Sequence, residues 1–395
     1  MKQEKRIRCG IIGAGFAANF HFESIRKVYG VDVEIMGVYS LRRESRERFA
    51  GAREIRAFDD IEQLLESCDI VHICTSVDSH EKLAVMALER DIFPIVEKPL
   101  TGYCGNGQQD FNGETADKQT ILRETLNSVN RILEAEAKSK AQLLYAENWV
   151  YAPAIQKEKQ IVEKSGAQIL WMHGEESHSG SHSKTYGYWK HSGGGVMLGK
   201  GCHPLTAALY LKRVEGIART GLPIRPKTVS ARVHSLTRLS SFVDEGHIRR
   251  GYYDIDDISM MHVVFEDGTL ADIHASDIVL GGIHNWLEVS ANNHRAVCNI
   301  NPNSAMLAYT PSEHHFKDIY LVEKTETKQG WSFPAPDEDL LTGFPAEMQA
   351  FYQTAAYGAP LESNSNLAAE AVSTIFSAYL SAQNGGKETE ITTYG

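Results

Sequence analysis

The sequence has no apolar run of the roughly 18 residues that a membrane-spanning helix needs. It has no CxxC pair either, and its six scattered cysteines are typical of a reduced cytoplasmic protein. A basic excess is also missing: the net charge of −11 argues against a surface for nucleic acid or for an anionic membrane. We therefore expect a cytoplasmic globular protein without a nucleic-acid or membrane partner.

The length of 395 residues exceeds what one ordinary core accommodates and favours two domains. The composition, with 42% hydrophobic and 23% charged residues, is that of a globular protein. Strand and helix signals alternate up to residue 148, which is typical of a parallel α/β sheet. The predicted strands are 6–12, 33–39, 70–74, 93–96 and 143–146, and the predicted helices are 17–29, 43–50, 80–90 and 118–137. The polar, glycine-rich stretch 101–117 is expected to be an exposed loop insertion.

After residue 148 the pattern changes to longer, partly alternating strands. The turn Glu266-Asp267-Gly268 is expected to join two of them as a hairpin. Residues 149–395 are therefore expected to form an α/β domain with an open, mainly antiparallel sheet and helices on one side. The predicted strands are 169–173, 228–234, 258–265, 270–275 and 286–290, and the predicted helices are 204–211, 345–356 and 367–382.

The first predicted strand runs into a GxGxxA turn, Gly13 to Ala18, and then into a helix. Gly13 permits the tight turn, Gly15 lets a pyrophosphate approach the backbone, and Ala18 lets the helix pack closely on the strand. Amides at the helix start, at Phe16 and Ala17, would face the phosphates. This order of strand, turn and helix predicts a dinucleotide site, with a glycine-rich turn that binds nothing as the alternative.

The acidic residue that would accept from the ribose 2′-OH of NAD is absent after the second strand. Ser40 with Arg42 or Arg43 stands there instead, which favours the 2′-phosphate of NADP. The alternative is that both arginines lie on a solvated helix start. The expected cofactor is therefore NAD(P), with NADP favoured.

Two further motifs carry a resemblance to a known family. Glu97-Lys98-Pro99 follows a predicted strand, and Gly193-Gly194-Gly195 precedes a Gly-x-His segment that ends at His203. With the GxGxxA turn, they resemble the glucose-fructose oxidoreductase/inositol 2-dehydrogenase/MocA (Gfo/Idh/MocA) family over essentially the whole chain.

The resemblance implies a Rossmann domain over residues 1–148 and a substrate-binding domain over 149–395 whose open sheet forms the interface of a homodimer or homotetramer. It implies sugars, cyclitols or their derivatives as substrates, in a cleft between the domains. Cofactor contacts are expected from Thr75, His80, Glu97 and Lys98.

Lys98 matches the active-site lysine of this family, which touches a substrate hydroxyl and the nicotinamide ribose. A residue before proline is held extended, so Lys98 can project into the cleft; a structural salt bridge is the alternative. His203 aligns with the family's catalytic histidine and suits general-base work, with a buried core histidine as the alternative. The family's aspartate, four residues ahead of that histidine, is Gly199 here, so the usual arrangement is incomplete.

The segment after residue 173 is rich in carboxylates and imidazoles. Glu176, His178 and His203 are a possible ligand set for a divalent metal, although their spacing matches no standard metal signature. Direct hydrogen bonds to sugar hydroxyls are favoured over a metal. The expected substrate contacts are Glu147, Asn148, Tyr151, Glu176, His178, Tyr188 and Trp189, whereas Asp254, Asp256 and Asp257 are expected in a solvated turn and Cys202 as a small buried residue.

The favoured function is hydride transfer between a nicotinamide cofactor and a hydroxyl or keto group of a sugar, glycoside or cyclitol. Lys98 would polarise the oxygen and His203 would exchange its proton. One alternative is an NAD-dependent glycosidase that oxidises its substrate transiently, eliminates the aglycone and shows no net redox. Another is a non-catalytic NAD(P)-binding regulator, which the presence of Lys98 and His203 does not favour.

Overall fold

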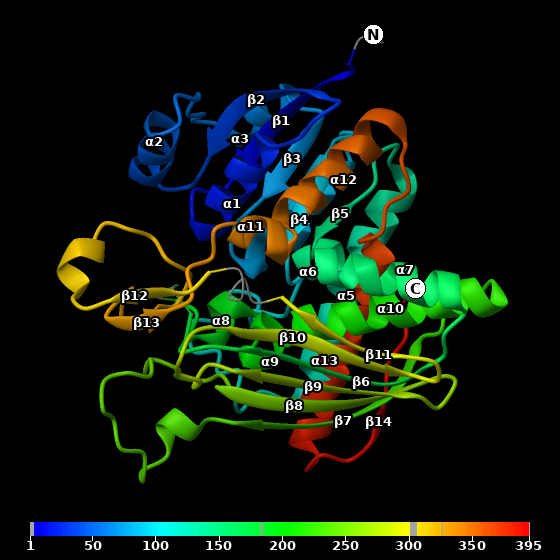
Figure 1. Ribbon diagram of the computed structural model, residues 1–395. Coiled ribbons are helices and arrows are strands. Elements are labelled where there is room, and N and C mark those ends of the chain that lie inside the picture. The colour runs from blue at the N-terminus through cyan, green and yellow to red at the C-terminus, as the bar shows by residue number, and fades with distance from the viewer. Residues whose placement is uncertain (1–3, 182, 184, 301–305, 326, 395) are drawn as a thin grey trace.

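The computed structural model describes residues 4–181, 183, 185–300, 306–325 and 327–394. A five-stranded sheet and a seven-stranded sheet lie one above the other with helices between them, and a two-stranded hairpin projects to one side (Figure 1). The predicted fold class is confirmed. None of the helices in the described ranges has the length and apolar character needed to cross a membrane.

The first sheet has the order β2-β1-β3-β4-β5, and all of its strands are parallel. Its central strands are continuous buried runs because helices cover both faces. Their carboxyl ends share one edge, which brings the residues after β1, β3, β4 and β5 together. The elements are β1 (Arg6–Ile12), α1 (Phe16–Ile25), β2 (Asp32–Tyr39), α2 (Arg43–Gly51), α3 (Ile61–Glu66), β3 (Ile70–Ile73), η1 (Val77–Ser79), α4 (His80–Leu88), β4 (Phe93–Glu97), α5 (Lys118–Lys138) and β5 (Leu144–Ala146).

The second sheet has the order β11-β10-β6-β9-β8-β7-β14 and is antiparallel except for the β6–β9 pair. The predicted hairpin between β8 and β9 is confirmed, with Gly268 at a positive φ of 81° in the turn. The strands are β6 (Ile169–Ser177), β7 (Pro226–His234), β8 (Ile258–Phe265), β9 (Leu270–Ser276), β10 (His284–Ala291), β11 (Arg295–Asn299) and β14 (Thr389–Glu390).

Helix α10 lies between the two sheets and packs on β6, β9 and β10, on α7 and on α13 (Figure 1). Helix α12 returns to the first sheet and packs on α1 and β1, so the predicted boundary between residues 148 and 149 stays a prediction. The remaining elements are α6 (Asn148–Tyr151), α7 (Pro153–Ser165), α8 (Trp189–Ser192), α9 (Val196–Gly199), α10 (Cys202–Thr220), η2 (Leu236–Arg238), β12 (Ala308–Thr310), η3 (Glu313–Phe316), β13 (Gly330–Ser332), α11 (Glu338–Thr342), α12 (Phe344–Tyr357) and α13 (Ser365–Gln383).

Two elements differ from their predicted bounds in a way that matters for function. Strand β6 runs to Ser177 rather than to residue 173, because hydrogen bonds from β9 and β10 support its polar end. Helix α10 begins at Cys202 rather than at residue 204, which places His203 in its first turn.

The predicted loop 101–117 contains no helix or strand, but it is not simply exposed. An added Cβ at Gly113 would overlap the Trp189 ring, so only glycine allows this approach. The buried Lys118 ammonium donates to the carbonyls of Gly113, Glu114 and Ala116. The ends of the insertion are therefore docked onto the second half of the chain.

The prediction that Asp254, Asp256 and Asp257 lie in a solvated turn was wrong, because all three are buried. Asp254 accepts the backbone N–H groups of Gly113 and Trp189, each at 2.8 Å. These carboxylates satisfy backbone donors that are distant in sequence, and a local pattern contains no sign of such partners.

Candidate active site

A cavity of about 650 Å³ lies where the carboxyl ends of the first sheet face β6 and α10. Its walls combine polar and charged side chains with the aromatic rings of Phe16, Phe20 and Trp149. The predicted site residues that line it are Phe16, Ala17, Thr75, Glu97, Lys98, Asn148, Glu176, His178 and His203.

The turn between β1 and α1 fits a dinucleotide diphosphate. Gly13 has a φ of 108°, and an added Cβ there would overlap the carbonyl oxygen of Cys74. Gly15 caps α1, and an added Cβ there would meet no atom within 4 Å, so the approach to the helix start is open. No side chain caps α1 and its first turn has no acidic residue, which leaves the positive end of the helix for an anion.

The residues after β2 show mixed support for a 2′-phosphate. Arg42 and Arg43 are exposed at the start of α2, and Arg43 Nε donates to Glu47 Oε1 at 2.7 Å. The carbonyl of Ser40 accepts from Arg46 at 3.1 Å. One of the two predicted arginines is thus engaged by its own helix.

Lys98 follows β4 and reaches across the cavity floor to the second half of the chain. Its ammonium donates to the carbonyl of Gly199 at 2.8 Å. Burial would lower the pKa of Lys98, but Cys202 and the acids Glu176, Glu97 and Glu147 together raise it, so the ammonium keeps its proton. This arrangement presents a cation to any oxygen bound beside it.

His80 supports this floor from behind and does not line the cavity. Its ring nitrogens lie 2.9 Å from the Pro99 carbonyl and 3.2 Å from the Thr75 carbonyl. The imidazole is buried, and burial lowers its pKa although both carbonyls act in the other direction. His80 thus ties together the segments after β3 and β4.

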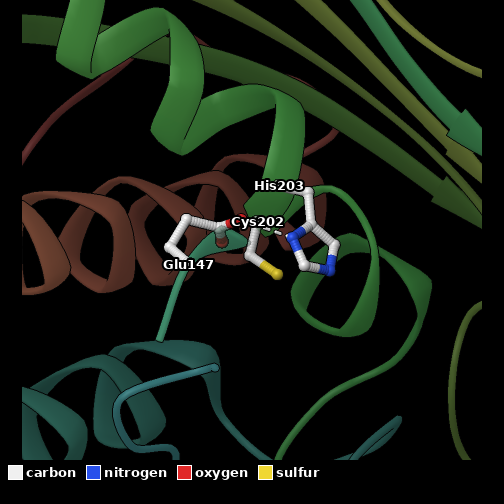
Figure 2. A group of neighbouring side chains, drawn as sticks. All are labelled: Glu147, Cys202 and His203. Atoms are coloured by element: carbon white, nitrogen blue, oxygen red, sulfur yellow. Dashed lines mark hydrogen bonds and ion pairs between the residues drawn. The ribbon is translucent and has the colours of Figure 1, made fainter. Parts of the chain in front are cut away.

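His203 is held on both sides of its ring. Its Nδ1 lies 2.5 Å from Glu147 Oε1 (Figure 2). Its ring also stacks on Trp149, with centroids 5.8 Å apart. Because Nδ1 is held by Glu147, Nε2 is the ring nitrogen that can exchange a proton in the cavity. Cys202 lies beside this pair, and burial raises the pKa of its thiol, which therefore stays protonated.

Glu176 comes from the extended end of β6 and faces the same histidine. Its Oε2 lies 3.7 Å from His203 Nε2 and has no hydrogen-bond partner among the described residues. Burial raises the pKa of Glu176, and the positive charge of Lys98 offsets part of this effect. A buried carboxyl with an unused oxygen is suited to a hydroxyl of a bound substrate.

Tyr186 fills the space beside Gly199. An added Cβ at residue 199 would overlap the Tyr186 hydroxyl and lie 2.8 Å from its Cε2. The hydroxyl donates to the carbonyl of Gly195 at 3.3 Å. The absence of a side chain at residue 199 is therefore matched by an aromatic ring that occupies its place.

A buried ion pair lies behind Tyr186. Lys200 contacts Asp277, and its ammonium lies 5.1 Å from the centre of the Tyr186 ring. Lys324, from the segment between β12 and β13, donates to the carbonyl of Gly180 at 2.6 Å and also lines the cavity. Sequence reasoning missed Lys200, Asp277 and Lys324, because no local motif joins residues so far apart.

Two of the three glycines before α9 have separate packing roles. Gly193 has a φ of 72° and approaches Gly102. An added Cβ at Gly195 would overlap the Asp256 carboxylate, which accepts from Met197 N at 3.0 Å. The motif thus lets two parts of the chain approach closely beneath the cavity.

Four predicted substrate contacts do not line the cavity. Glu147 is buried behind His203, and the Tyr151 hydroxyl accepts from Ser363 N at 3.1 Å within the core. Trp189 is buried under the insertion, where aromatic residues of the loop cover the core. Tyr188 stacks on Tyr253 with centroids 4.2 Å apart, away from the cavity.

The possible metal set of Glu176, His178 and His203 is not drawn tightly together. His178 Nδ1 accepts from Gly180 N at 3.1 Å. Within the described ranges, a group of three ligand-type residues whose donor atoms all lie within 4.8 Å is formed by Glu147, Cys202 and His203 (Figure 2). In that group Glu147 Oε1 already binds His203 Nδ1.

Comparisons with known proteins give a consistent result. Residues 7–112 match the model of the Gfo/Idh/MocA oxidoreductase family with an NAD-binding Rossmann fold. UDP-N-acetylglucosamine 3-dehydrogenase of Acidithiobacillus ferrooxidans is 30% identical over 95 residues, 24% of this chain and 29% of that protein. Inositol 2-dehydrogenase 4 of Saccharopolyspora erythraea is 32% identical over 122 residues, 30% of this chain and 36% of that protein. The matched segment thus spans about a third of the length of these curated relatives.

Solved structures share the fold over nearly the whole chain. GenD2 from gentamicin A biosynthesis, in complex with NAD, has a TM-score of 0.77 at 18% identity and covers 98% of this chain and 97% of its own. Myo-inositol 2-dehydrogenase from Lactobacillus plantarum has a TM-score of 0.72 at 18% identity and covers 98% of this chain and 100% of its own. Both curated relatives are named as dehydrogenases. Residues 7–112 are thus similar to the NAD-binding Rossmann fold of the Gfo/Idh/MocA oxidoreductase family, and the solved structures share the fold of nearly the whole chain.

Proposed function

We propose that the protein is an NAD(P)-dependent dehydrogenase that acts on a hydroxyl or keto group of a sugar, glycoside or cyclitol. One observation supports this most strongly: a lysine ammonium and a histidine Nε2 face the same cavity as the dinucleotide cradle. Lys98 lines it from β4, and His203 lines it from the first turn of α10.

The proposed chemistry divides between these two residues. When bound, the nicotinamide supplies the hydride acceptor or donor. The Lys98 ammonium donates to the substrate oxygen and stabilises the negative charge that develops on it. His203 Nε2 takes the hydroxyl proton during oxidation and returns it during reduction, while Glu147 orients the ring and stabilises the imidazolium.

The polar walls favour a substrate with several hydroxyl groups. Asn148, Glu176 and His178 line the cavity, and Tyr186, Thr185 and Ser181 extend its hydrogen-bonding surface. Glu176 offers an oxygen that uses no protein donor. We expect two neighbouring hydroxyls to bind together, one at Lys98 and His203 and the other at Glu176.

The test is to incubate the protein with NAD⁺ or NADP⁺ and each member of a panel of monosaccharides, glycosides and cyclitols. Formation of NAD(P)H is followed by absorbance in the nicotinamide band. We expect stoichiometric NAD(P)H formation with at least one compound. Lys98→Ala and His203→Gln should each lower kcat about 10²- to 10⁴-fold, the usual contribution of a positioned acid or base. Lys138→Ala, an exposed lysine at the end of α5, is the matched control and should change nothing. If the Lys98 and His203 variants kept full activity, the assignment would fail.

A divalent metal has less support than direct hydrogen bonding. The raised pKa of Lys98 means that a cation already faces Glu176 and Glu147, and a second cation there would be repelled. We expect unchanged activity after dialysis against chelator. Stoichiometric metal in the dialysed protein, with loss of activity on its removal, would overturn this.

We also propose that the outer face of the second sheet joins subunits into a homodimer or homotetramer. Leu170, Trp171, Met260 and Val297 are exposed on its strands. Light scattering of the purified protein should give a mass of two or four chains. Met260→Glu should lower that mass, since an unpaired charge is costly in a buried interface.

A further inference from the structure

A chain of hydrogen bonds runs from α12 through the interior of the first sheet and its helix α1 and ends at Glu97. The Tyr352 hydroxyl lies 3.0 Å from His72 Nε2, His72 Nδ1 lies 2.9 Å from His21 Nδ1, and His21 Nε2 lies 2.9 Å from Glu97 Oε1. Tyr352, His72 and His21 have no exposed surface. None of the three takes part in the proposed hydride transfer, so this buried chain needs a separate explanation.

The chain joins the elements that hold the two halves of the site. His21 lies on α1, whose start forms the diphosphate cradle, and Glu97 ends β4. The second oxygen of Glu97, Oε2, accepts the backbone N–H of Lys98 at 3.0 Å. Both oxygens of this carboxylate are thus held, and the carboxylate itself lines the cavity.

The direction of the hydrogen bonds follows from the charge of Glu97. Burial would raise the pKa of Glu97, but the hydrogen bond from His21 and the charge of Lys98 lower it, so the carboxylate is ionised. An ionised carboxylate only accepts, so His21 Nε2 donates to Glu97. Burial lowers the pKa of His72 well below its usual value, so this ring is neutral. We expect the other donors to point in the same direction, from Tyr352 to His72 Nε2 and from His72 Nδ1 to His21 Nδ1.

Two further titratable side chains face Glu97. Lys98 keeps its proton and places one cation beside Glu97. The buried Glu347 also faces Glu97, and burial together with the charges of Glu97 and Glu147 raises its pKa, so it adds no negative charge.

We propose that this chain holds Glu97 as a fixed anion beside the nicotinamide half of the cofactor and makes the site prefer the oxidised form. The inference rests on the proposed function. A dinucleotide with its diphosphate at α1 and its adenosine at β2 extends its nicotinamide towards β4, where Glu97 lies. The oxidised ring carries a positive charge that the reduced ring lacks, so a nearby anion discriminates between them.

The test is the ratio of dissociation constants for the reduced and oxidised cofactor, measured by calorimetry and by NADH fluorescence. The pair used is NAD⁺ with NADH, or NADP⁺ with NADPH if the phosphorylated pair binds more tightly. We expect Glu97→Gln to lower the preference for the oxidised form about tenfold, or about 1.4 kcal/mol. His72→Leu should lower it several-fold, whereas His72→Asn, which keeps an amide donor near the position of Nδ1, should lower it less.

Two controls keep the test decisive. Ser24→Ala changes a buried hydroxyl on α1 outside the chain and should leave the ratio unchanged. If His72→Leu does not fold, Tyr352→Phe removes only the last donor and should shift the ratio in the same direction. An unchanged ratio in Glu97→Gln overturns the inference.

Nitrogen NMR of histidine-labelled protein tests the direction of the chain without any cofactor. We expect His21 to be protonated at Nε2 alone and His72 at Nδ1 alone. Protonation of His21 at both nitrogens would overturn the proposal. A protein that binds both cofactor forms but oxidises no sugar would instead overturn the proposed function, and the ratio would remain measurable.

Discussion

Gly199→Ala is expected to damage the site through the ring of Tyr186. The added Cβ would overlap the Tyr186 hydroxyl and lie 2.8 and 2.9 Å from Cε2 and Cζ, so the ring or α9 must move. Overpacking of this kind costs about 1–3 kcal/mol. Because the Gly199 carbonyl accepts from Lys98, a shift of α9 also moves the catalytic ammonium. We expect a loss of kcat on the order of tenfold or more, since small misplacements are costly in catalysis.

A double-mutant cycle isolates this contact. In a Tyr186→Ala background the ring is absent, so Gly199→Ala should not destabilise the fold. It should instead raise the unfolding free energy by about 0.4–1 kcal/mol, because alanine lowers the conformational entropy of the unfolded chain. The coupling energy from urea unfolding should therefore reach about 2 kcal/mol, above the roughly 0.5 kcal/mol expected of independent sites. An equal cost of Gly199→Ala in both backgrounds would refute the reasoning.

Three further predictions follow from single side chains. Glu147→Gln keeps the shape of the orienting group but stabilises the imidazolium less, so kcat should fall at least tenfold with little change in KM, and equal kcat would rule out this role. Arg42→Ser should weaken NADP⁺ binding about three- to tenfold without affecting NAD⁺, as a single exposed charge contact does; calorimetry with both cofactors checks this. Burial raises the pKa of Asp256 to about 6 from 3.8 in the unfolded chain, so its protonated form contributes stability below about pH 4 that is lost as the pH rises through 6. The two pKa values correspond to about 3 kcal/mol of unfolding free energy. The unfolding free energy measured at pH 4.5 and at pH 7 should therefore differ less for Asp256→Asn than for the wild type.

The parts that sequence could predict are those with local physical causes. The strands of the first sheet are short apolar runs, and a covered parallel sheet requires that composition. Gly13 and Gly15 could be identified because a tight turn and an open helix start exclude side chains there. Lys98 and His203 were assigned from motifs, and the structure places both in one cavity.

The parts that sequence could not predict depend on partners far away in the chain. Glu147 and Asn148 are adjacent, yet one lies behind His203 and the other lines the cavity, because Glu147 caps the short helix α6 and Asn148 is the first residue of that helix. Trp189 is an expected substrate contact, but the insertion covers its ring. No periodicity or spacing in the sequence indicates that Gly113 packs against the Trp189 ring.

The same limit applies to residue 199, where the resemblance to the family leads us to expect an aspartate. The motif shows that a glycine stands there, but it does not show which residues of β6 and of the loop before α8 surround it. Tyr186 occupies the vacated space, and Glu176 brings a carboxylate to 3.7 Å from His203. An aspartate restored at residue 199 would therefore meet the Tyr186 ring and would add a third carboxylate near Glu147 and Glu176. Like charges at such distances raise one another's pKa values, so the restored group would be partly protonated. A glycine at residue 199 therefore fits both the Tyr186 ring and the carboxylates that already surround His203.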